Sequence, residues 1–89
     1  MTTINFSSHF RSSIKKLARK QPEVIAAVVE KTLLFSSNVN HPSLKLHKLS
    51  GSLKDHWSFT IEYDLRIVFC YTDDGSILFI DIGNHNEVY

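Results

Sequence analysis

Apolar residues recur along the chain with two different periods, and the change between them divides the sequence into a helical part and a strand part. The first part has apolar side chains every three or four positions, at Phe6, Phe10, Ile14 and Leu17. This spacing predicts an amphipathic helix. Ser7 or Ser8 can cap it, because a serine oxygen accepts an N–H of the first turn. Residues 4–6 are a candidate short first strand.

A second helix is predicted to follow after a short turn around Gln21. Pro22 suits the first turn of a helix, where its missing N–H costs nothing. The segment from Glu23 to about Phe35 combines good helix formers with apolar residues at Ile25, Val28, Val29 and Leu33. Polar residues at 36–38, and then residues 40–42, end this helix. The two helices are therefore expected to form a hairpin.

From Trp57 onward the apolar positions alternate with polar ones, which predicts strands. Residues 57–64 form the first of these strands, and the next continues the alternation at Leu65, Ile67, Phe69 and Tyr71 after a tight turn near residues 63–64. Residues 73–75, Asp-Asp-Gly, indicate a hairpin, and residues 76–82 form a last strand whose apolar run favours an interior position. The predicted fold class is α+β, with an N-terminal helical hairpin packed on one face of a small antiparallel sheet.

Length and composition fit one intracellular domain spanning residues 1–89. The start of the chain lacks the basic and apolar regions of a signal peptide, and the longest apolar run has six residues, from Val24 to Val29. Cys70 is the single cysteine, and we expect it to be a buried small hydrophobe in a reducing compartment. The expected location is cytoplasmic, without membrane association.

The net charge of +1 conceals a strong asymmetry between the two parts of the chain. Residues 1–54 hold nine Lys and Arg and two acids, whereas residues 55–89 hold one Arg and seven acids. A basic region of this kind suits a polyanion, although two solvated surfaces would give the same numbers. Lysines in the segment 41–57 could contact RNA phosphates beside Trp57, or could simply be solvated. These candidate RNA-binding residues are Lys45, Lys48 and Lys54.

Four side chains from three separate segments could together cleave RNA: His47, Arg66, His85 and Tyr89. One histidine can take the proton from a ribose 2′-OH while another protonates the leaving oxygen, and an arginine can stabilise the charged phosphoryl oxygens. Each residue also has an ordinary explanation, such as a structural hydrogen bond for either histidine, an ion pair for Arg66, or turn chemistry for Asp64. The histidine spacings do not form a zinc pattern. No metal or other cofactor is expected.

The segments HKLSGSLKDHWS, YDLRIVF and IGNHNEVY, together with the Asp-Gly turn, resemble the RelE/ParE superfamily of bacterial toxins over essentially the whole chain. The resemblance favours the branch of RelE-, YoeB- and YafQ-like mRNA interferases. It implies the toxin of a type II toxin–antitoxin system, a ribosome-dependent endoribonuclease that cuts mRNA in the A site without a metal. It further implies His47 as base, His85 as acid, Arg66 as phosphate ligand, Tyr89 as the aromatic that orients substrate, and Asp64 as support for the site.

The same resemblance implies a cognate antitoxin, the ribosome and mRNA as partners, and allows a higher-order toxin–antitoxin complex. The lysine-bearing helices would then meet ribosomal RNA. Two departures from YafQ-like toxins stand out: Thr60 replaces a histidine, and Asp81 replaces a basic residue. They suggest weaker catalysis. The alternatives are therefore a ParE-like inhibitor of DNA gyrase without enzymatic activity, or a catalytically weak member that acts as a binding module.

Overall fold

The computed structural model describes residues 3–51, 55–84 and 88. The helical part of the chain contains strand β1 (Ile4–Phe6), helix α1 (Ser8–Lys20), a 3₁₀ turn (Pro22–Val24) and helix α2 (Ile25–Ser37). A second 3₁₀ turn (Pro42–Leu44) leads into the remaining strands. These are β2 (His47–Lys48), β3 (Trp57–Glu62), β4 (Leu65–Tyr71) and β5 (Ile77–Gly83). In this described part, no helix has the length and apolar character needed to cross a membrane.

Helix α1 begins where the sequence predicts, because Ser7 satisfies two backbone groups at once. Its Oγ accepts the N–H of Phe10 at 3.0 Å and donates to the carbonyl of Ile80 at 2.9 Å. The first bond caps the helix, and the second ties that cap to β5. The helix ends at Gln21, whose N–H bonds to the carbonyl of Leu17. The predicted turn between the helices is therefore confirmed.

The five strands form one sheet in the order β1-β5-β4-β3-β2. The predicted α+β class is confirmed, but the sheet is mixed, because β1 pairs parallel with β5 while the other pairs are antiparallel. The three residues of β1 are too few to reveal a pairing direction. That direction follows from the tertiary contacts that bring α1 against β5. The segment expected to be a basic loop also contains β2, a two-residue edge strand.

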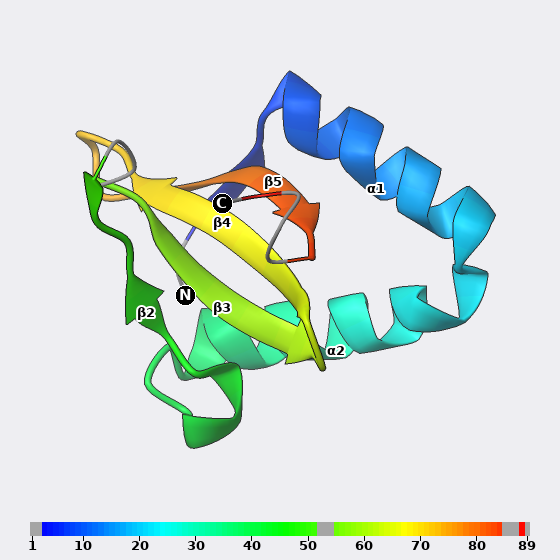
Figure 1. Cartoon of the computed structure of the whole chain (residues 1–89). Helices are drawn as coiled ribbons and strands as arrows, with labels where there is room; N and C mark the ends of the chain where they lie inside the picture. The colour runs from blue at the N-terminus through cyan, green and yellow to red at the C-terminus, as the bar shows by residue number, and fades with distance from the viewer. Residues whose placement is uncertain (1–2, 52–54, 85–87, 89) are drawn as a thin grey trace.

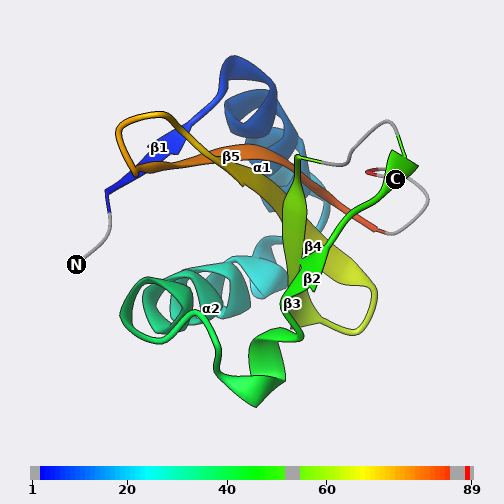
Figure 2. The ribbon, with the colours of Figure 1, turned by 90° about the vertical axis from the view of Figure 1, so that its left-hand side faces the viewer.

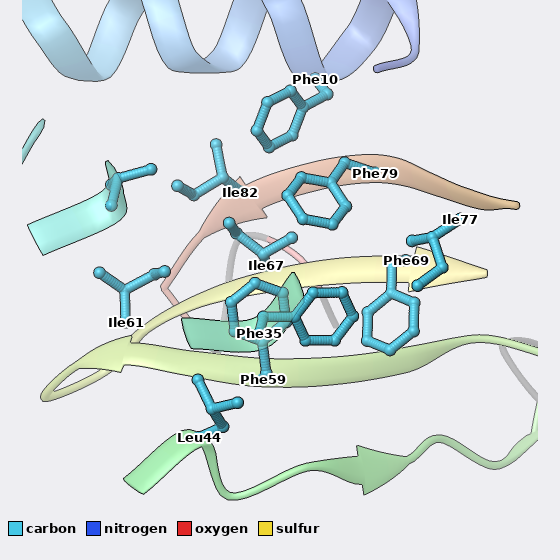
Figure 3. Packing of buried hydrophobic residues seen from close by; sticks show 11 residues of the cluster. Phe10, Phe35, Leu44, Phe59, Ile61, Ile67, Phe69, Ile77, Phe79 and Ile82 are labelled. Atoms are coloured by element: carbon cyan, nitrogen blue, oxygen red, sulfur yellow. The ribbon is translucent and has the colours of Figure 1, made fainter. Parts of the chain in front are cut away.

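Both helices pack on the same face of the sheet, but they diverge from their turn (Figure 1). Helix α1 lies against β5 and α2 lies against β3. In the view rotated by 90°, α2 lies to one side of β3 and β4 (Figure 2). Side chains from both helices and from the three long strands meet in one core (Figure 3). Its fully buried members include Phe59, Phe69, Phe79, Leu44 and Ile67.

Two tight turns order the strands of the sheet. Gly75 adopts φ 84° between β4 and β5, as the Asp-Asp-Gly signal predicts. Tyr63 adopts φ 46° between β3 and β4, although a side chain at this angle is unusual. The Tyr63 side chain is almost fully exposed. These short connections fix the strand register, and the register decides which side chains share a face.

Candidate functional site

Two of the predicted catalytic side chains lie on the face of the sheet that turns away from the helices, called here the second face. His47 is paired with Ser58, and Arg66 is paired with Thr60. Directly opposed residues point to the same side of a sheet, and so do residues two apart along one strand. The neighbours Phe59 and Ile67 point into the core. The register therefore places His47 and Arg66 on the second face, on either side of β3.

The separation of these two residues suits a ligand the size of a phosphodiester. They are two strands apart and two residues apart along the strand direction, so strand spacings put their Cα atoms about 12 Å from each other. The long side chain of Arg66 can span much of that distance. His47 is exposed and Arg66 is half-buried. Arg66 also interacts with another group in the protein. A group bound between them would reach imidazole and guanidinium together.

The last residue of β5 lies beside Arg66. Gly83 is paired with Arg66, so the chain leaves the sheet directly beside the guanidinium-bearing strand. The N–H of Val88 bonds to the carbonyl of Asn84 at 3.1 Å. The predicted acid His85 and the predicted aromatic Tyr89 belong to this segment but lie outside the described residues.

The other predicted site residues are distributed around β3. Asp64 is exposed at the turn before β4, near Arg66 in sequence, and it interacts with another group. Lys45 adopts a left-handed conformation, with φ 48°. It lines a cleft of about 550 Å³ together with Thr60 and Tyr63. Lys54 lies outside the described residues.

Lys48 occupies a different environment from the residues that share the second face. It is paired with Trp57, and its Nζ lies 5.7 Å from the centre of the Trp57 ring. Trp57 packs against the core cluster and makes an edge contact with the ring of Tyr71. Lys48 therefore stands on the helix-facing side of β2, and the structure does not bring it together with His47 and Arg66.

Asp81 does not project a free negative charge toward the site. Its Oδ1 accepts hydrogen bonds from Ser13 Oγ at 2.9 Å and from the N–H of Ile82 at 2.8 Å. Its Oδ2 lies 3.1 Å from Nε2 of His9. These contacts hold the carboxylate between α1 and β5. Asp81, which stands where YafQ-like toxins have a basic residue, thus connects helix α1 to the sheet.

Two features of the second face were not evident from the alternating pattern. Ser58 lies between His47 and Val68 and is only 2% exposed, although the pattern of β3 places it among polar residues. Cys70 is half-buried rather than buried, and desolvation raises the pKa of its thiol. Within the described part of the chain, no three His, Cys, Asp or Glu side chains gather in a group that could hold a metal ion.

Comparison with known proteins identifies the family to which this chain belongs. A family model described as "Bacterial toxin of type II toxin-antitoxin system, YafQ" matches residues 2–89. The chain therefore belongs to the YafQ family of toxins of type II toxin–antitoxin systems. No curated protein gives a significant match.

Solved structures share the fold over the whole chain. The YafQ structure from E. coli strain BL21(DE3) is 22% identical, with a TM-score of 0.82 over 100% of this chain and 99% of that one. A metal-bound toxin from Helicobacter pylori is 26% identical, with a TM-score of 0.75 over 100% of both chains. The E. coli DinJ–YafQ complex has also been solved. Its matching chain is 23% identical, with a TM-score of 0.79 over 100% of this chain and 99% of that one. The predicted resemblance to the toxin superfamily is thus confirmed.

Proposed function

We propose that this toxin is a ribosome-dependent endoribonuclease that cuts mRNA in the A site. The observation that carries the proposal is the register of β2, β3, β4 and β5. It puts His47 and Arg66 on one face of the sheet, and it pairs Arg66 with Gly83, which is two residues before His85 in the sequence. Family membership gives the toxin class, and the arrangement of these residues favours RNA cleavage within that class.

The chemistry requires no group beyond the protein and the RNA. Neutral His47 accepts the proton of a ribose 2′-OH as the 2′ oxygen attacks the adjacent phosphorus. The bond from phosphorus to the 5′ oxygen breaks, and protonated His85 gives its proton to that leaving oxygen. The products are a 2′,3′-cyclic phosphate and a 5′-OH end. Arg66 stabilises the extra negative charge on the phosphoryl oxygens.

The remaining predicted residues have supporting roles in this proposal. Tyr89 stacks on a base or the ribose and fixes the direction of attack. Asp64 holds the turn next to Arg66, and Lys45 attracts RNA phosphates at the outer edge of β3. Lys54 adds positive charge in the segment before β3, whereas Lys48, which lies over Trp57, contacts RNA beyond the reacting phosphate.

Growth arrest in bacteria tests the assignment of acid and base. Expression of the toxin without its antitoxin should stop growth, and His47→Ala and His85→Ala should each relieve the arrest. His41→Asn is a matched control, since His41 lies outside the proposed site and an asparagine oxygen can still accept the N–H of Ser43. Arrest by both site variants at wild-type strength would contradict the proposal. If both variants also inhibited DNA supercoiling by gyrase, the ParE-like alternative would replace the ribonuclease proposal. If the wild type did not arrest growth at all, a catalytically weak binding module would be favoured.

A cognate antitoxin is the expected protein partner, and the molecule has a surface suited to one. The divergence of α1 and α2 leaves an apolar groove of about 400 Å³, with Phe6 41%, Val29 54% and Leu33 63% exposed around it. Arg11 stands at its edge, with its guanidinium carbon 5.6 Å from the centre of the Phe6 ring. We propose that an amphipathic antitoxin helix with an acidic edge covers this groove. Higher-order assembly of the two proteins stays a prediction.

Substitution within the groove separates antitoxin binding from toxicity. Leu33→Asp should weaken binding of the antitoxin encoded beside the toxin, because it places a charge in an apolar contact. The same variant should still arrest growth when it is expressed alone. Asn40→Asp is the control, because it adds the same charge at an exposed position outside the groove. Equal antitoxin affinity for Leu33→Asp and the wild type would show that the groove is not the docking surface.

The ribosome is proposed to meet the outer surface of α1. This helix carries no acidic residue, and its five basic residues are Arg11, Lys15, Lys16, Arg19 and Lys20. Such a surface binds RNA phosphates, and the affinity for ribosomes should fall steeply with salt. Reversing the charge of Lys15 and Lys16 together should lower ribosome binding while leaving cleavage of free RNA at its basal rate.

A further inference from the structure

Among the described residues, a second histidine reaches the second face of the sheet beside His47, and the proposed chemistry does not use it. The N–H of Leu49 bonds to the carbonyl of His56 at 2.9 Å, which extends the pairing of β2 with β3 by one more step. His56 precedes Trp57, whose ring belongs to the helix-facing side. Alternation along the strand therefore directs the His56 imidazole to the second face, on the same side as Ser58.

The register places His56 next to His47. His47 is paired with Ser58, so His56 is its diagonal neighbour on β3, at about 7–8 Å. On the second face of β3, Thr60 lies beside Arg66, Ser58 lies beside His47, and His56 is the next residue on this face. Each step is two residues, or about 6.7 Å, and an extended RNA strand covers a similar length with one nucleotide.

The two ring nitrogens of His56 are in different environments. Nδ1 is buried, and none of the described groups offers it a hydrogen bond. His56 as a whole is half-buried, and its buried unpartnered atom is Nδ1, which leaves Nε2 as the ring nitrogen that a ligand can reach. A neutral imidazole has one N–H donor and one acceptor. An N–H hidden at Nδ1 would lose its hydrogen bond to water altogether, which favours the proton on Nε2.

We propose that His56 is a substrate-binding residue whose Nε2–H donates to a phosphate oxygen of the nucleotide adjacent to the cleaved bond. The buried Nδ1 holds the ring in one tautomer, and the outward N–H extends the row formed by Arg66 and His47. His56 transfers no proton in the reaction. It sets where the RNA lies, and its loss should change the affinity for RNA rather than the chemical step. This inference rests on the proposed ribonuclease function for the identity of the ligand.

Long-range ¹H–¹⁵N NMR of the full-length protein tests the tautomer and the contact directly. The His56 ring should show its proton on Nε2, and the Nε2 signal should shift when a short single-stranded RNA is added. The RNA carries 2′-fluoro sugars, so it cannot attack its own phosphates. A proton on Nδ1, or an Nε2 signal that stays in place while RNA saturates the protein, would overturn the inference.

Matched variants test the contribution to binding of the same RNA. His56→Phe keeps the ring shape without a donor and should weaken binding about tenfold, as expected for loss of one hydrogen bond to a charged acceptor. His56→Gln offers an amide N–H close to the position of Nε2 and should retain most of the affinity. In a cleavage assay, His56→Phe should raise KM and leave both kcat and its pH profile unchanged. Equal affinities for His56→Phe and wild type would contradict the inference.

The two proposals can fail separately. If the wild type cuts translated mRNA but RNA leaves the His56 signal and the His56→Phe affinity unaffected, the nuclease stands and the His56 contact is wrong. If the wild type cuts nothing, yet RNA shifts Nε2 and His56→Phe binds more weakly, the RNA contact stands and the nuclease is wrong. Absence of any RNA binding by the wild type would overturn the contact. Should His56→Phe unfold, the wild-type NMR titration alone decides.

Discussion

The ring of Phe59 should contribute strongly to stability, because it links helix α2 to the strands that bear the site. Phe59 is 0% exposed, and its ring stacks on that of Phe35 with centroids 4.4 Å apart. The rings of Phe69 and Phe79 lie 6.0 and 5.7 Å away. These neighbours come from α2, β4 and β5, so the space left by a smaller side chain cannot be closed by one element moving inward.

Phe59→Ala should therefore lower the free energy of unfolding by about 4–5 kcal/mol, in the upper part of the range for buried phenylalanine. The free energy of unfolding of a small domain is about 5–15 kcal/mol in total, so the variant should be only marginally stable. Phe59→Leu keeps most of the volume but loses the stacked ring. A double-mutant cycle with Phe35→Leu should show a coupling of about 0.5–1.5 kcal/mol between the two rings.

Urea unfolding followed by circular dichroism measures these changes, provided that the slope with denaturant stays constant. Leu33→Ala is the control on α2, since Leu33 is 63% exposed and its truncation should cost about 0.5 kcal/mol or less. A loss below about 2 kcal/mol for Phe59→Ala would refute the reasoning. It would mean that the aromatic cluster relaxes around the cavity.

Three further predictions concern single contacts. Ser7→Ala should destabilise the fold by about 1–2 kcal/mol in thermal or urea unfolding, because it removes the cap of α1 and the bond to β5, whereas Ser12→Ala on the exposed side of α1 should cost less than about 0.5 kcal/mol. The hydrogen bonds from the Thr72 hydroxyl and the Ser76 N–H lower the pKa of Asp74, so NMR titration should find it below its ordinary value, and Thr72→Ala should raise it. The resulting stability is present above about pH 4 and is lost as the pH falls through the lowered pKa. Burial raises the pKa of the Cys70 thiol, so alkylation near neutral pH should be slower than for a free cysteine and should quicken on unfolding; an equal rate in the folded protein would contradict this.

Most of the fold could be predicted from local signals, since both helices and the three long strands each carry one. Ser7, the proline at position 22 and the glycine at position 75 marked boundaries that the structure retains. Strand β1 was a candidate at residues 4–6, but its parallel pairing with β5 could not be predicted, because three residues carry no direction and the partner is distant in sequence. The two-residue strand β2 was hidden in a basic segment for a similar reason.

The arrangement of the candidate site depends on register, which the sequence does not specify by itself. Residue types suggested His47 and Arg66, but their common face follows from two separate strand pairings. The same alternation explains why Lys48, one residue further along, stands on the opposite face with Trp57. The engagement of Asp81 by Ser13 required α1 to pack against β5, a contact between segments far apart in the chain.

Cleavage of a translated message by the purified toxin tests the central claim most directly. Primer extension and end-group analysis should find cuts within the ribosomal A site, with a 2′,3′-cyclic phosphate upstream and a 5′-OH downstream. His47→Ala and His85→Ala should each slow the cutting step by about 10²–10⁴ at saturating ribosomes. Cleavage that leaves a 3′-OH, or that proceeds at the wild-type rate in both variants, would contradict acid–base catalysis on the second face of the sheet.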